Sequence, residues 1–417
     1  MTNSWLSRRE MMIQCGVAGL AAFCMGAKTL RASEGAPNVR PITRGPKHHW
    51  FGYYDKFEFD PSDRYVLGME VDFEHRSPRA NDEIRVGMVD IEDGDRWIEL
   101  GSTTAWCWQQ GCMLQWLPGS NSEVIWNDRE ADHYVSRILD VKIYEKRTVP
   151  HPIYTVSPNG KIALAPDFRR LNDVRPGYGY VGLPDPYAND LAPKETGLYR
   201  VDLETGDQEM LFSFADIAGF GKPKHSMTDA KHKFNHLLFN PDGTRFVFLH
   251  RWRYPNGVRL SRMFTANPDG SDLRVLDDNG LTSHFIWRDN THILAWSNQP
   301  SHGPALYLFE DGSSNIDVVA KTAIKADGHV NYLPGGEWIV DDTYPDADRN
   351  QEVFLYHPST DRRVSLGKFY SPAPYTGEWR CDTHPRVSRN GQMLVIDSPD
   401  KDEGRQLHLI DLRGVLG

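Results

Sequence analysis

The chain has 417 residues, of which 25% are charged and 39% hydrophobic, and its formal net charge is −10. Its Lys and Arg residues are scattered rather than clustered, so the composition argues against a nucleic-acid-binding surface. With only 5 cysteines, the chain is also unlike a scaffold built on disulfides.

The N-terminus has the pattern of an export signal. A twin arginine at positions 8–9 is followed by a modest apolar segment over 16–27, which resembles a Tat signal. Residues 1–32 are therefore predicted to be a Tat-type signal peptide, with cleavage after Ala27 or Ala32. The apolar run is short and glycine-rich for a membrane-spanning helix, and an uncleaved anchor is the alternative. The mature protein is expected in the periplasm or outside the cell, without stable membrane insertion.

Removal of the signal leaves three cysteines. Cys107 and Cys112 are close enough in sequence to pair, and Cys381 would stay free or ligate a metal. The Tat route exports proteins that fold before transport, often around a metal or cofactor. The predicted signal therefore favours a metal or cofactor in the folded protein.

Seven copies of one hairpin pattern follow the signal. Each copy has a short alternating strand, a turn rich in Pro, Asn, Asp and Gly, and a second apolar strand. The residue five positions before the turn takes an equivalent place in every copy, which we call the slot. In chain order the slot residues are Lys56, Met113, Ile153, His236, His284, His329 and His384.

A second hairpin pattern alternates with the first, and its strands end in an acidic or polar turn. These strands are expected over 86–90, 138–142, 198–202, 263–267, 306–310, 353–357 and 407–411. Short β-strands that repeat at roughly 45–55 residues are typical of propellers. Residues 33–417 are therefore predicted to form a single all-β domain, a seven-bladed β-propeller with four-stranded antiparallel blades.

The last expected strand, 407–412, has no partner before the chain ends. Segment 39–43 has the composition of an edge strand. We predict that this N-terminal strand completes the seventh blade, because a closed ring has no open sheet edge.

Segments of the first two blades are expected to face the axial funnel and to bind substrate. Loop 47–56 is dense in polar and aromatic residues and includes Tyr54; an aromatic plug between blades is the alternative. In the second blade Gln110 is a candidate funnel residue.

Two insertions interrupt the repeat, over 171–196 and 214–233. Loops this long in a compact repeat are usually functional or disordered. The Tyr and Arg content of the first insertion favours a lid over the substrate, with Arg175 and Tyr180 as substrate-binding candidates.

Four consecutive blades carry histidine in the slot: His236, His284, His329 and His384. Since the innermost strands of a propeller surround its axis, these side chains are expected to share one arc of the funnel. Imidazole is the commonest ligand for Zn, Mn and Fe, and three imidazoles with a carboxylate leave a position open for substrate. His284, His329, His384 and Asp382 are the predicted metal ligands. A repeat-consensus histidine that hydrogen-bonds a loop is the alternative.

The order of export signal, seven hairpin repeats, His236, His284 and the motif 382–385 (Asp-Thr-His-Pro) resembles the seven-bladed propeller polysaccharide lyases, chiefly the oligogalacturonate lyases. The resemblance implies a divalent metal held by histidines of the late blades and a further histidine, here His236, as the base. The family pattern has two closely spaced histidines and a glutamine. Here the first of them corresponds to Asp382 and no glutamine is clearly placed, which leaves Mn²⁺ and Zn²⁺ both open.

Tyr154 and Arg170 resemble a pair found in the ulvan lyases, which are also propellers. That resemblance implies a tyrosine acting as acid and base and an arginine that neutralises the uronate carboxylate. The two accompanying histidines of those enzymes are not matched, and Gln110 and Asn127 stand nearby instead. The base is therefore left open between His236 and Tyr154.

β-Elimination from a uronate needs a neutralised carboxylate, a base for the C5 proton and a stabilised enolate. Arg169, Arg170 and Arg175 can bind carboxylates bidentately. We expect an exported, monomeric lyase that uses a divalent metal to cleave uronate-containing oligo- or polysaccharides.

Two other functions fit the same repeats. The first is a non-catalytic exported propeller that binds a glycan or protein partner, resembling the propeller half of TolB-like proteins. The second is a propeller hydrolase, but the chain has neither the Asp-box of sialidases nor a G-x-S-x-G elbow. Serine peptidases that carry propellers also need a catalytic domain that this length cannot hold.

Overall fold

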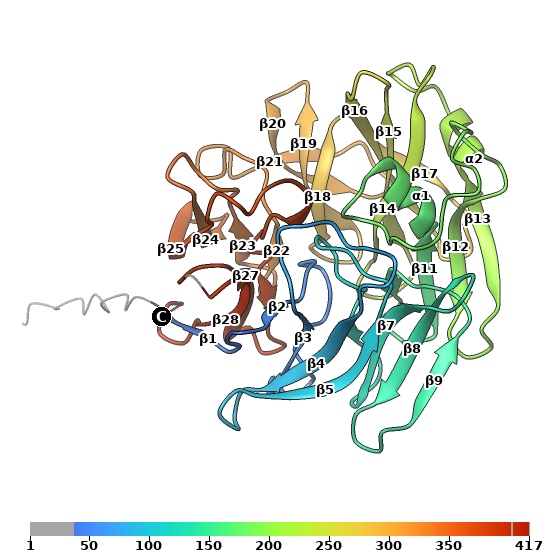
Figure 1. Cartoon of the computed structure of the whole chain (residues 1–417). Coiled ribbons are helices and arrows are strands. Elements are labelled where there is room, and N and C mark those ends of the chain that lie inside the picture. Colours follow the sequence, from blue (N-terminus) through green and yellow to red (C-terminus); the bar gives the residue numbers. More distant parts are fainter. Residues whose placement is uncertain (1–36, 402, 417) are drawn as a thin grey trace, which may run out of the picture.

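The computed structural model describes residues 37–401 and 403–416. Seven four-stranded antiparallel sheets are arranged around a central axis as the blades of a propeller (Figure 1). The predicted fold class is therefore confirmed. The predicted signal peptide, residues 1–32, lies outside the described residues.

Each blade begins with its innermost strand. Blade 1 consists of β2 (His48–Trp50), β3 (Tyr65–Val71), β4 (Ile84–Asp90) and β5 (Arg96–Thr103). Blade 2 consists of β6 (Gln115–Trp116), β7 (Glu123–Arg129), β8 (Tyr134–Asp140) and β9 (Lys146–Val149). Blade 3 consists of β10 (Thr155–Val156), β11 (Ile162–Pro166), β12 (Gly197–Asp202) and β13 (Gln208–Ser213). Blades 4 and 5 consist of β14 (Lys231–Phe239), β15 (Phe246–Arg253), β16 (Arg259–Ala266) and β17 (Arg274–Gly280), and of β18 (Thr282–Trp287), β19 (His292–Gln299), β20 (Gly303–Glu310) and β21 (Ile316–Val319). Blades 6 and 7 consist of β22 (Asn331–Tyr332), β23 (Ile339–Asp342), β24 (Asn350–His357) and β25 (Arg362–Tyr370), and of β26 (Arg386–Val387), β27 (Met393–Ser398), β28 (Gln406–Asp411) and β1 (Asn38–Pro41).

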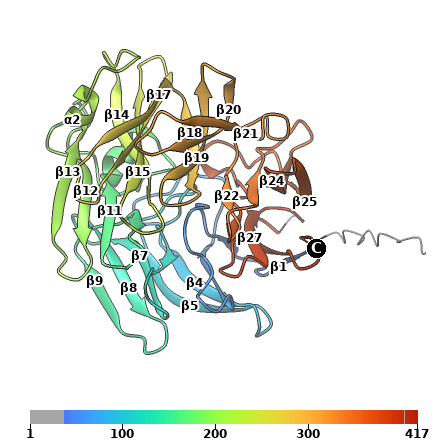
Figure 2. The same ribbon diagram turned by 180° about the vertical axis from the view of Figure 1, so that it is seen from behind.

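The N-terminal strand closes the ring, as predicted. β1 pairs antiparallel with β28, with Val39 opposite Ile410. Both ribbon views place β1 beside the strands of blade 7 (Figures 1 and 2). The first and last strands of the chain therefore share one sheet.

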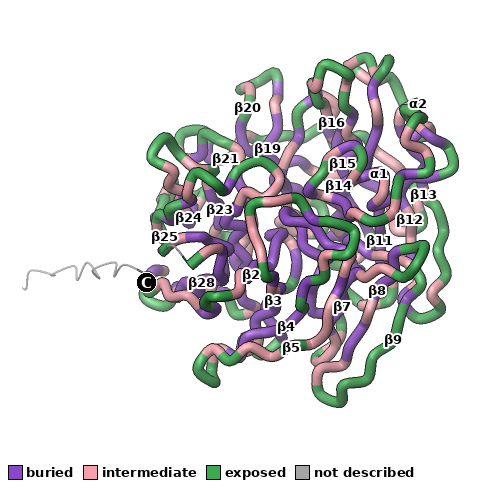
Figure 3. Tube along the Cα trace, in the orientation of Figure 1, coloured by how far each residue is buried: buried purple, intermediate pink, exposed green. Residues whose placement is uncertain are grey.

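Apolar side chains of neighbouring blades pack together in the buried core. Exposed residues gather at the hairpin tips (Figure 3). Phe248 of blade 4 stacks on Phe212 of blade 3 with 5.8 Å between the ring centroids. Trp50, Trp106 and Trp108 interlock at the boundary of blades 1 and 2, with centroid distances of 5.0 to 5.6 Å. Burial of a large apolar side chain contributes about 1.5–3 kcal/mol, so these contacts are a major part of what holds neighbouring blades together.

The helices lie in the loops between strands. α1 (Phe168–Val174) opens the first insertion with Asp167 as its N-cap, and α2 (Phe214–Gly219) opens the second with a Ser213 capping box. A short 3-10 turn, η1 (Gly377–Trp379), precedes blade 7. Within 37–401 and 403–416, no helix has the length and apolar character needed to traverse a lipid bilayer.

The three cysteines of the described residues are free and buried. The Cys107 thiol lies 3.6 Å from the Gly111 carbonyl oxygen, and Cys112 Sγ lies 3.6 Å from Met69 Sδ. The possible Cys107–Cys112 pair therefore does not form. Burial raises the pKa of Cys381, which disfavours the thiolate needed for metal ligation.

A buried ionic network fixes the start of blade 7. The guanidinium of Arg386 donates to both carboxylate oxygens of Glu58 at 3.0 Å and to Asp397 at 2.8 Å. It also donates to the carbonyl oxygens of Thr383 and His384. Burial raises the pKa of Glu58 to about 7 in spite of this partner. Arg386 therefore joins blade 7 to blade 1 and holds the backbone of a slot histidine.

Replacing Arg386 by methionine should lower the free energy of unfolding by about 3–5 kcal/mol, because Glu58 and Asp397 would remain buried without their cation. Urea unfolding followed by tryptophan fluorescence measures the change. Arg413→Met is the matched control, since the Arg413–Asp411 pair is exposed and such pairs contribute about 0–1 kcal/mol. Equal losses in both variants would contradict the role given to this network.

Candidate metal centre

The four slot histidines meet on one side of the propeller axis. The ring centroids of successive histidines, from His236 through His284 and His329 to His384, are 6.4, 4.4 and 4.1 Å apart. All four side chains are buried. The structure therefore brings together the imidazoles that the repeat places in consecutive blades.

Local backbone irregularities aim these side chains inward. The pairing of β14 with β15 shifts between Asn235 and Leu238, and His236 has a φ of +53°. His384 has a φ of +42°, and the register of β18 shifts around His284. A left-handed conformation at a non-glycine residue costs about 1–3 kcal/mol and clusters at functional sites. A bulge re-aims a side chain that regular pleating would direct elsewhere.

His329, Asp382 and His384 have the geometry of a metal site, with one ligand atom from each lying within 4.8 Å of the others. His329 Nδ1 is bonded to Asp342 at 2.9 Å, and its buried Nε2 has no hydrogen-bond partner among the described residues. Asp382 Oδ2 is buried and makes an ion pair with Arg380 Nε at 2.7 Å without hydrogen-bond geometry. His329 Nε2, which has no partner, and Asp382 Oδ2, which has only the Arg380 ion pair, are therefore available to bind a divalent cation.

Carboxylates behind the histidines fix the orientation of two rings. His284 Nδ1 lies 3.1 Å from Asp327, in the same way that His329 Nδ1 lies against Asp342. A metal-binding histidine usually gives its other ring nitrogen to such a partner, which sets the tautomer. His284 Nε2 and His329 Nε2 are therefore the nitrogens left for a ligand.

The charge of the site also favours a cation. Asp327, Asp342 and Asp382 surround His329, and of these three carboxylates Arg380 makes an ion pair with Asp382. Burial alone would lower the pKa of His329, but these carboxylates raise it to about 9. A divalent ion would supply the positive charge that a protonated His329 otherwise provides, and the mixed nitrogen and oxygen donors suit Mn²⁺ or Zn²⁺.

Segment 51–56 lies on the axis as a plug that contacts five blades. The ring of Tyr54 lies within 6.4 Å of the rings of all four slot histidines, and its hydroxyl donates to the Phe285 carbonyl oxygen. Gly52 N donates to Asp397 of blade 7. Loop 47–56 therefore faces the axis, as expected, but its tyrosines are buried under the histidines rather than open to the funnel.

A polar chain runs through this plug. Tyr53 Oη lies 3.3 Å from His236 Nδ1, and His236 Nε2 lies 3.4 Å from Asp55 Oδ2. Asp55 in turn accepts a hydrogen bond from Lys56 at 2.8 Å. Burial lowers the pKa of His236 to about 4, so its imidazole is neutral at neutral pH and can accept a proton.

Tyr154 and Gln110 lie next to the plug. The Gln110 amide donates to Tyr154 Oη at 2.8 Å, and Lys56 Nζ lies 4.6 Å from the centroid of the Tyr154 ring. Burial raises the pKa of Tyr154 well above its usual value. The phenol therefore stays protonated, as that of Tyr53 does, but the group bonded to it is an amide N–H donor, which cannot take up the phenol proton. This disfavours Tyr154 as the base.

The structure does not bring Arg170, Arg169 or Tyr180 to the histidine arc. Arg170 is fully buried, and its donors are taken by Asp185 and by backbone carbonyl oxygens, chiefly of the first insertion. Arg169 is paired with Asp167. Tyr180 stacks on Phe168 at 4.3 Å. These side chains hold the insertion in place, which is why they are not free to meet a substrate.

The inner strands surround a central channel along the propeller axis. We call the end of this channel at which the inner strands begin the upper mouth. A cavity of about 580 Å³ opens there, and it is lined by His284, Arg175, Tyr178, Arg251, Arg253, Arg259, Tyr344 and Arg380, among others. Arg175 of the first insertion is one of these lining residues, and its role in substrate binding stays a prediction. Five arginines make this mouth a site for an anionic ligand.

Several functional residues escaped the sequence reasoning. Asp342 and Asp397 lie in the second strand of their hairpins at equivalent positions, where blade 4 has Leu249 and blade 5 has Ser297. Each aspartate accepts backbone N–H groups of an axial segment, Asp342 from His329 and His384, and Asp397 from the plug. The sequence signal that could have identified them is this second set of polar residues at equivalent positions of the repeat.

Histidines outside the slots lie away from the arc. His292 and His357 are half-buried and His302 is exposed. His232 and His250 are buried and stacked, with 2.7 Å between His232 Nδ1 and His250 Nε2. Burial lowers the pKa of His232 to about 4 and that of His250 well below its usual value.

This pair predicts a pH-dependent stability. Since the unfolded chain binds protons at these histidines below about pH 6.5 and the native state does not, their contribution is complete above pH 6.5 and is lost as the pH falls toward 4. Each histidine contributes a slope of up to about 1.4 kcal/mol per pH unit. Urea unfolding at pH 7.5 and pH 5 should show a smaller loss for His250→Gln than for the wild type. Equal losses would contradict the assignment.

The sequence matches no protein-family model and no curated protein. The structure is similar to an oligogalacturonate lyase from Vibrio parahaemolyticus, with a TM-score of 0.63 and 14% identity over 91% of this chain and 95% of that chain. An oligogalacturonate lyase in complex with manganese gives a TM-score of 0.64 and 13% identity, over 89% and 92% of the two chains. A prolyl endopeptidase gives 0.51 and 11%, over 90% of this chain and 49% of that chain. At these identities the likeness is one of fold, and it agrees with the propeller lyase resemblance found in the sequence.

Proposed function

We propose that this protein is an exported polysaccharide lyase that cleaves uronate-containing glycans by metal-assisted β-elimination. The observation that carries the proposal is the cluster of His329, Asp382 and His384 next to an arginine-lined mouth. Two residues of the mouth reach the cluster: the His284 ring centroid lies 4.4 Å from that of His329, and Arg380 makes an ion pair with Asp382. A cation site next to a cationic mouth suits a substrate whose reacting unit is itself a carboxylate. The fold shared with oligogalacturonate lyases, one of them solved with manganese, supports the same class.

The residues of the mouth would bind and orient the substrate. A divalent ion held by the cluster would act as a Lewis acid on the carboxylate next to the C5 proton. Arg175, Arg251 and Arg380 offer guanidinium groups for carboxylates of this and neighbouring sugar units.

We assign the proton transfer to His236 acting through Tyr53. Tyr53 Oη lies 3.3 Å from His236 Nδ1, and in this assignment its oxygen takes the C5 proton while its own proton passes to Nδ1. Because Tyr53 is buried, this relay requires the plug to open to the substrate. Asp55 beside Nε2 favours the tautomer in which Nδ1 is the acceptor. The electron pair of the broken C–H bond forms the C4–C5 double bond, the C4–O bond breaks with its electron pair going to oxygen, and this oxygen takes up a proton from water.

A panel of uronate polysaccharides tests the proposal. The mature protein is incubated with polygalacturonate, alginate and glucuronan in the presence of Mn²⁺ or Zn²⁺, and the ultraviolet absorbance of the unsaturated uronate is followed. We expect at least one substrate to give this product. Absence of absorbance with all of them, in protein shown to contain the ion, would reject the lyase. Cell fractionation tests the export that forms part of this proposal.

A further inference from the structure

A second cavity opens at the other end of the channel, which we call the lower mouth. Inner strand β18 begins near Ser283 and His284 at the upper mouth and ends with Ile286 and Trp287 at the lower one. The lower cavity has a volume of about 690 Å³, which is within the range of sites for small molecules. The plug, 51–56, separates it from the histidine arc.

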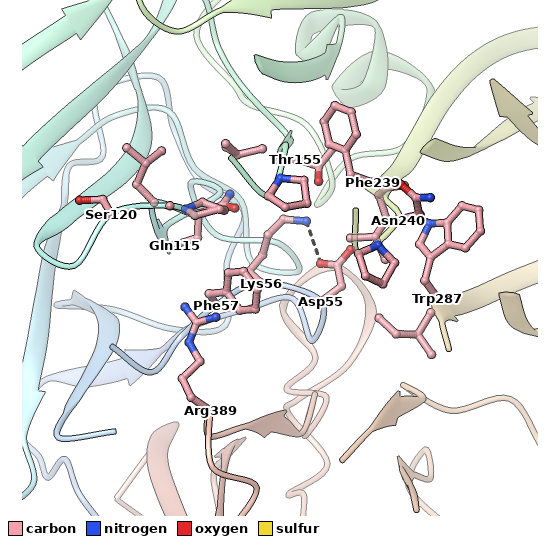
Figure 4. Close-up of a pocket in the computed structure, with 18 of the residues that line it drawn as sticks. Asp55, Lys56, Phe57, Gln115, Ser120, Thr155, Phe239, Asn240, Trp287 and Arg389 are labelled. Carbon is pink, nitrogen blue, oxygen red and sulfur yellow. Dashed lines mark hydrogen bonds and ion pairs between the residues drawn. The ribbon is translucent and has the colours of Figure 1, made fainter. Parts of the chain in front are cut away.

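One wall of this cavity carries polar groups that lack protein partners. Thr155 Oγ1 and Gln115 Oε1 have no hydrogen-bond partner among the described residues, although both side chains are more than nine-tenths buried. Lys56 lies between them and Asp55, and of its three N–H donors only the one to Asp55 is used in a hydrogen bond (Figure 4). An occupant therefore finds two acceptors and spare ammonium donors.

The opposite wall is aromatic and aliphatic. Phe239 and Trp287 lie across the cavity from Gln115 and Ser120 (Figure 4). Leu238 and Ile286 extend this wall. A cavity with one wall of hydrogen-bonding groups and one of aromatic rings matches a pyranose, whose hydroxyls are polar and whose C–H faces pack on aromatic rings.

The charge of the lower mouth differs from that of the upper mouth. Lys56 is neutralised by Asp55, and both side chains are almost fully buried. The remaining cation, Arg389, stands at the rim, where its guanidinium lies 3.5 Å from the Phe57 ring centroid. The floor therefore offers no net charge for a carboxylate, in contrast to the arginines above.

We infer that the lower mouth is a second binding site, which takes a neutral pyranose unit. Its hydroxyls would donate to Thr155 Oγ1 and Gln115 Oε1 and accept from Lys56 Nζ. Because the plug closes the channel between the two mouths, this site does not depend on the lyase reaction.

Saturation-transfer NMR on the mature protein tests the inference, with methyl β-D-glucopyranoside, methyl β-D-galactopyranoside and methyl β-D-xylopyranoside as neutral probes and D-glucuronate as the anionic one. We expect at least one neutral probe to receive saturation. Thr155→Val should weaken its Kd about 2- to 12-fold, the range for one lost hydrogen bond of about 0.5–1.5 kcal/mol. Arg251→Ala, at the upper mouth, should leave it unchanged.

Three outcomes would overturn the inference. The first is the absence of saturation transfer to every neutral probe. The second is an affinity for the neutral probe that falls in Arg251→Ala but not in Thr155→Val. The third is binding of D-glucuronate that is tighter than that of any neutral probe and that is weakened by Thr155→Val. Gln115→Leu provides a second reading should Thr155→Val fold poorly. None of these measurements requires lyase activity, so a failed lyase assay and a failed sugar assay reject different proposals.

Discussion

Purified mature protein should contain about one equivalent of Mn²⁺ or Zn²⁺, and His329→Ala should reduce this content at least tenfold. His329 offers an Nε2 that is buried without a partner and a ring fixed by Asp342. Removal of the His329 imidazole also removes the positive charge that lies next to the carboxylates of Asp382 and Asp342. Metal analysis by mass spectrometry, after dialysis against a weak chelator, gives the content directly.

Graded variants distinguish ligation from a general loss of structure. Asp342→Asn keeps the imidazole and alters only the carboxylate behind it, so affinity should fall about 10- to 100-fold. His292→Ala is the matched control, because His292 is half-buried and bonded to Asp289 far from the arc. A wild-type protein that is fully active without any ion, or equal metal loss in His292→Ala, would contradict the centre.

The repeat made the fold and the arc predictable from the sequence. Hairpins with Pro, Asp and Gly turns have local determinants, so their number and order could be read directly. The slot rule then placed His236, His284, His329 and His384 in equivalent positions, and equivalence in a propeller implies convergence on the axis. The repeat accounts for the convergence of the four rings, whereas their unequal centroid distances of 6.4, 4.4 and 4.1 Å depend on the local backbone at each histidine.

Contacts between distant segments could not be predicted in this way. The plug touches five blades through long-range packing that has no period in the sequence. Two candidates for the substrate lie away from the arc for the same reason: Tyr180, chosen from the composition of the first insertion, and Arg170, chosen from the resemblance to ulvan lyases. The structure uses Arg170 to satisfy carbonyl oxygens of an irregular loop, because buried backbone groups need partners.

The proton acceptor can be identified by a second set of variants. His236→Asn should lower kcat by about 10²- to 10⁴-fold, the contribution typical of a general base, while metal content stays near that of the wild type. Asparagine is the suitable replacement, because His236 has a φ of +53° and asparagine tolerates this conformation better than most residues. The rate of formation of the unsaturated product measures the effect.

Tyr53→Phe and Tyr154→Phe separate the two routes that the sequence left open. Both substitutions remove one hydroxyl from a buried ring, so their costs in stability should be similar. If His236 acts through Tyr53, Tyr53→Phe should lose activity nearly as strongly as His236→Asn, since the phenol is the only group between the imidazole and the substrate in this assignment. Tyr154→Phe should keep most of its activity, because Tyr154 accepts a hydrogen bond from the Gln110 amide and, within the described residues, is not bonded to an imidazole that could receive its proton. The reverse ranking would make Tyr154 the base and leave His236 as a residue that packs against Phe285 at 3.8 Å.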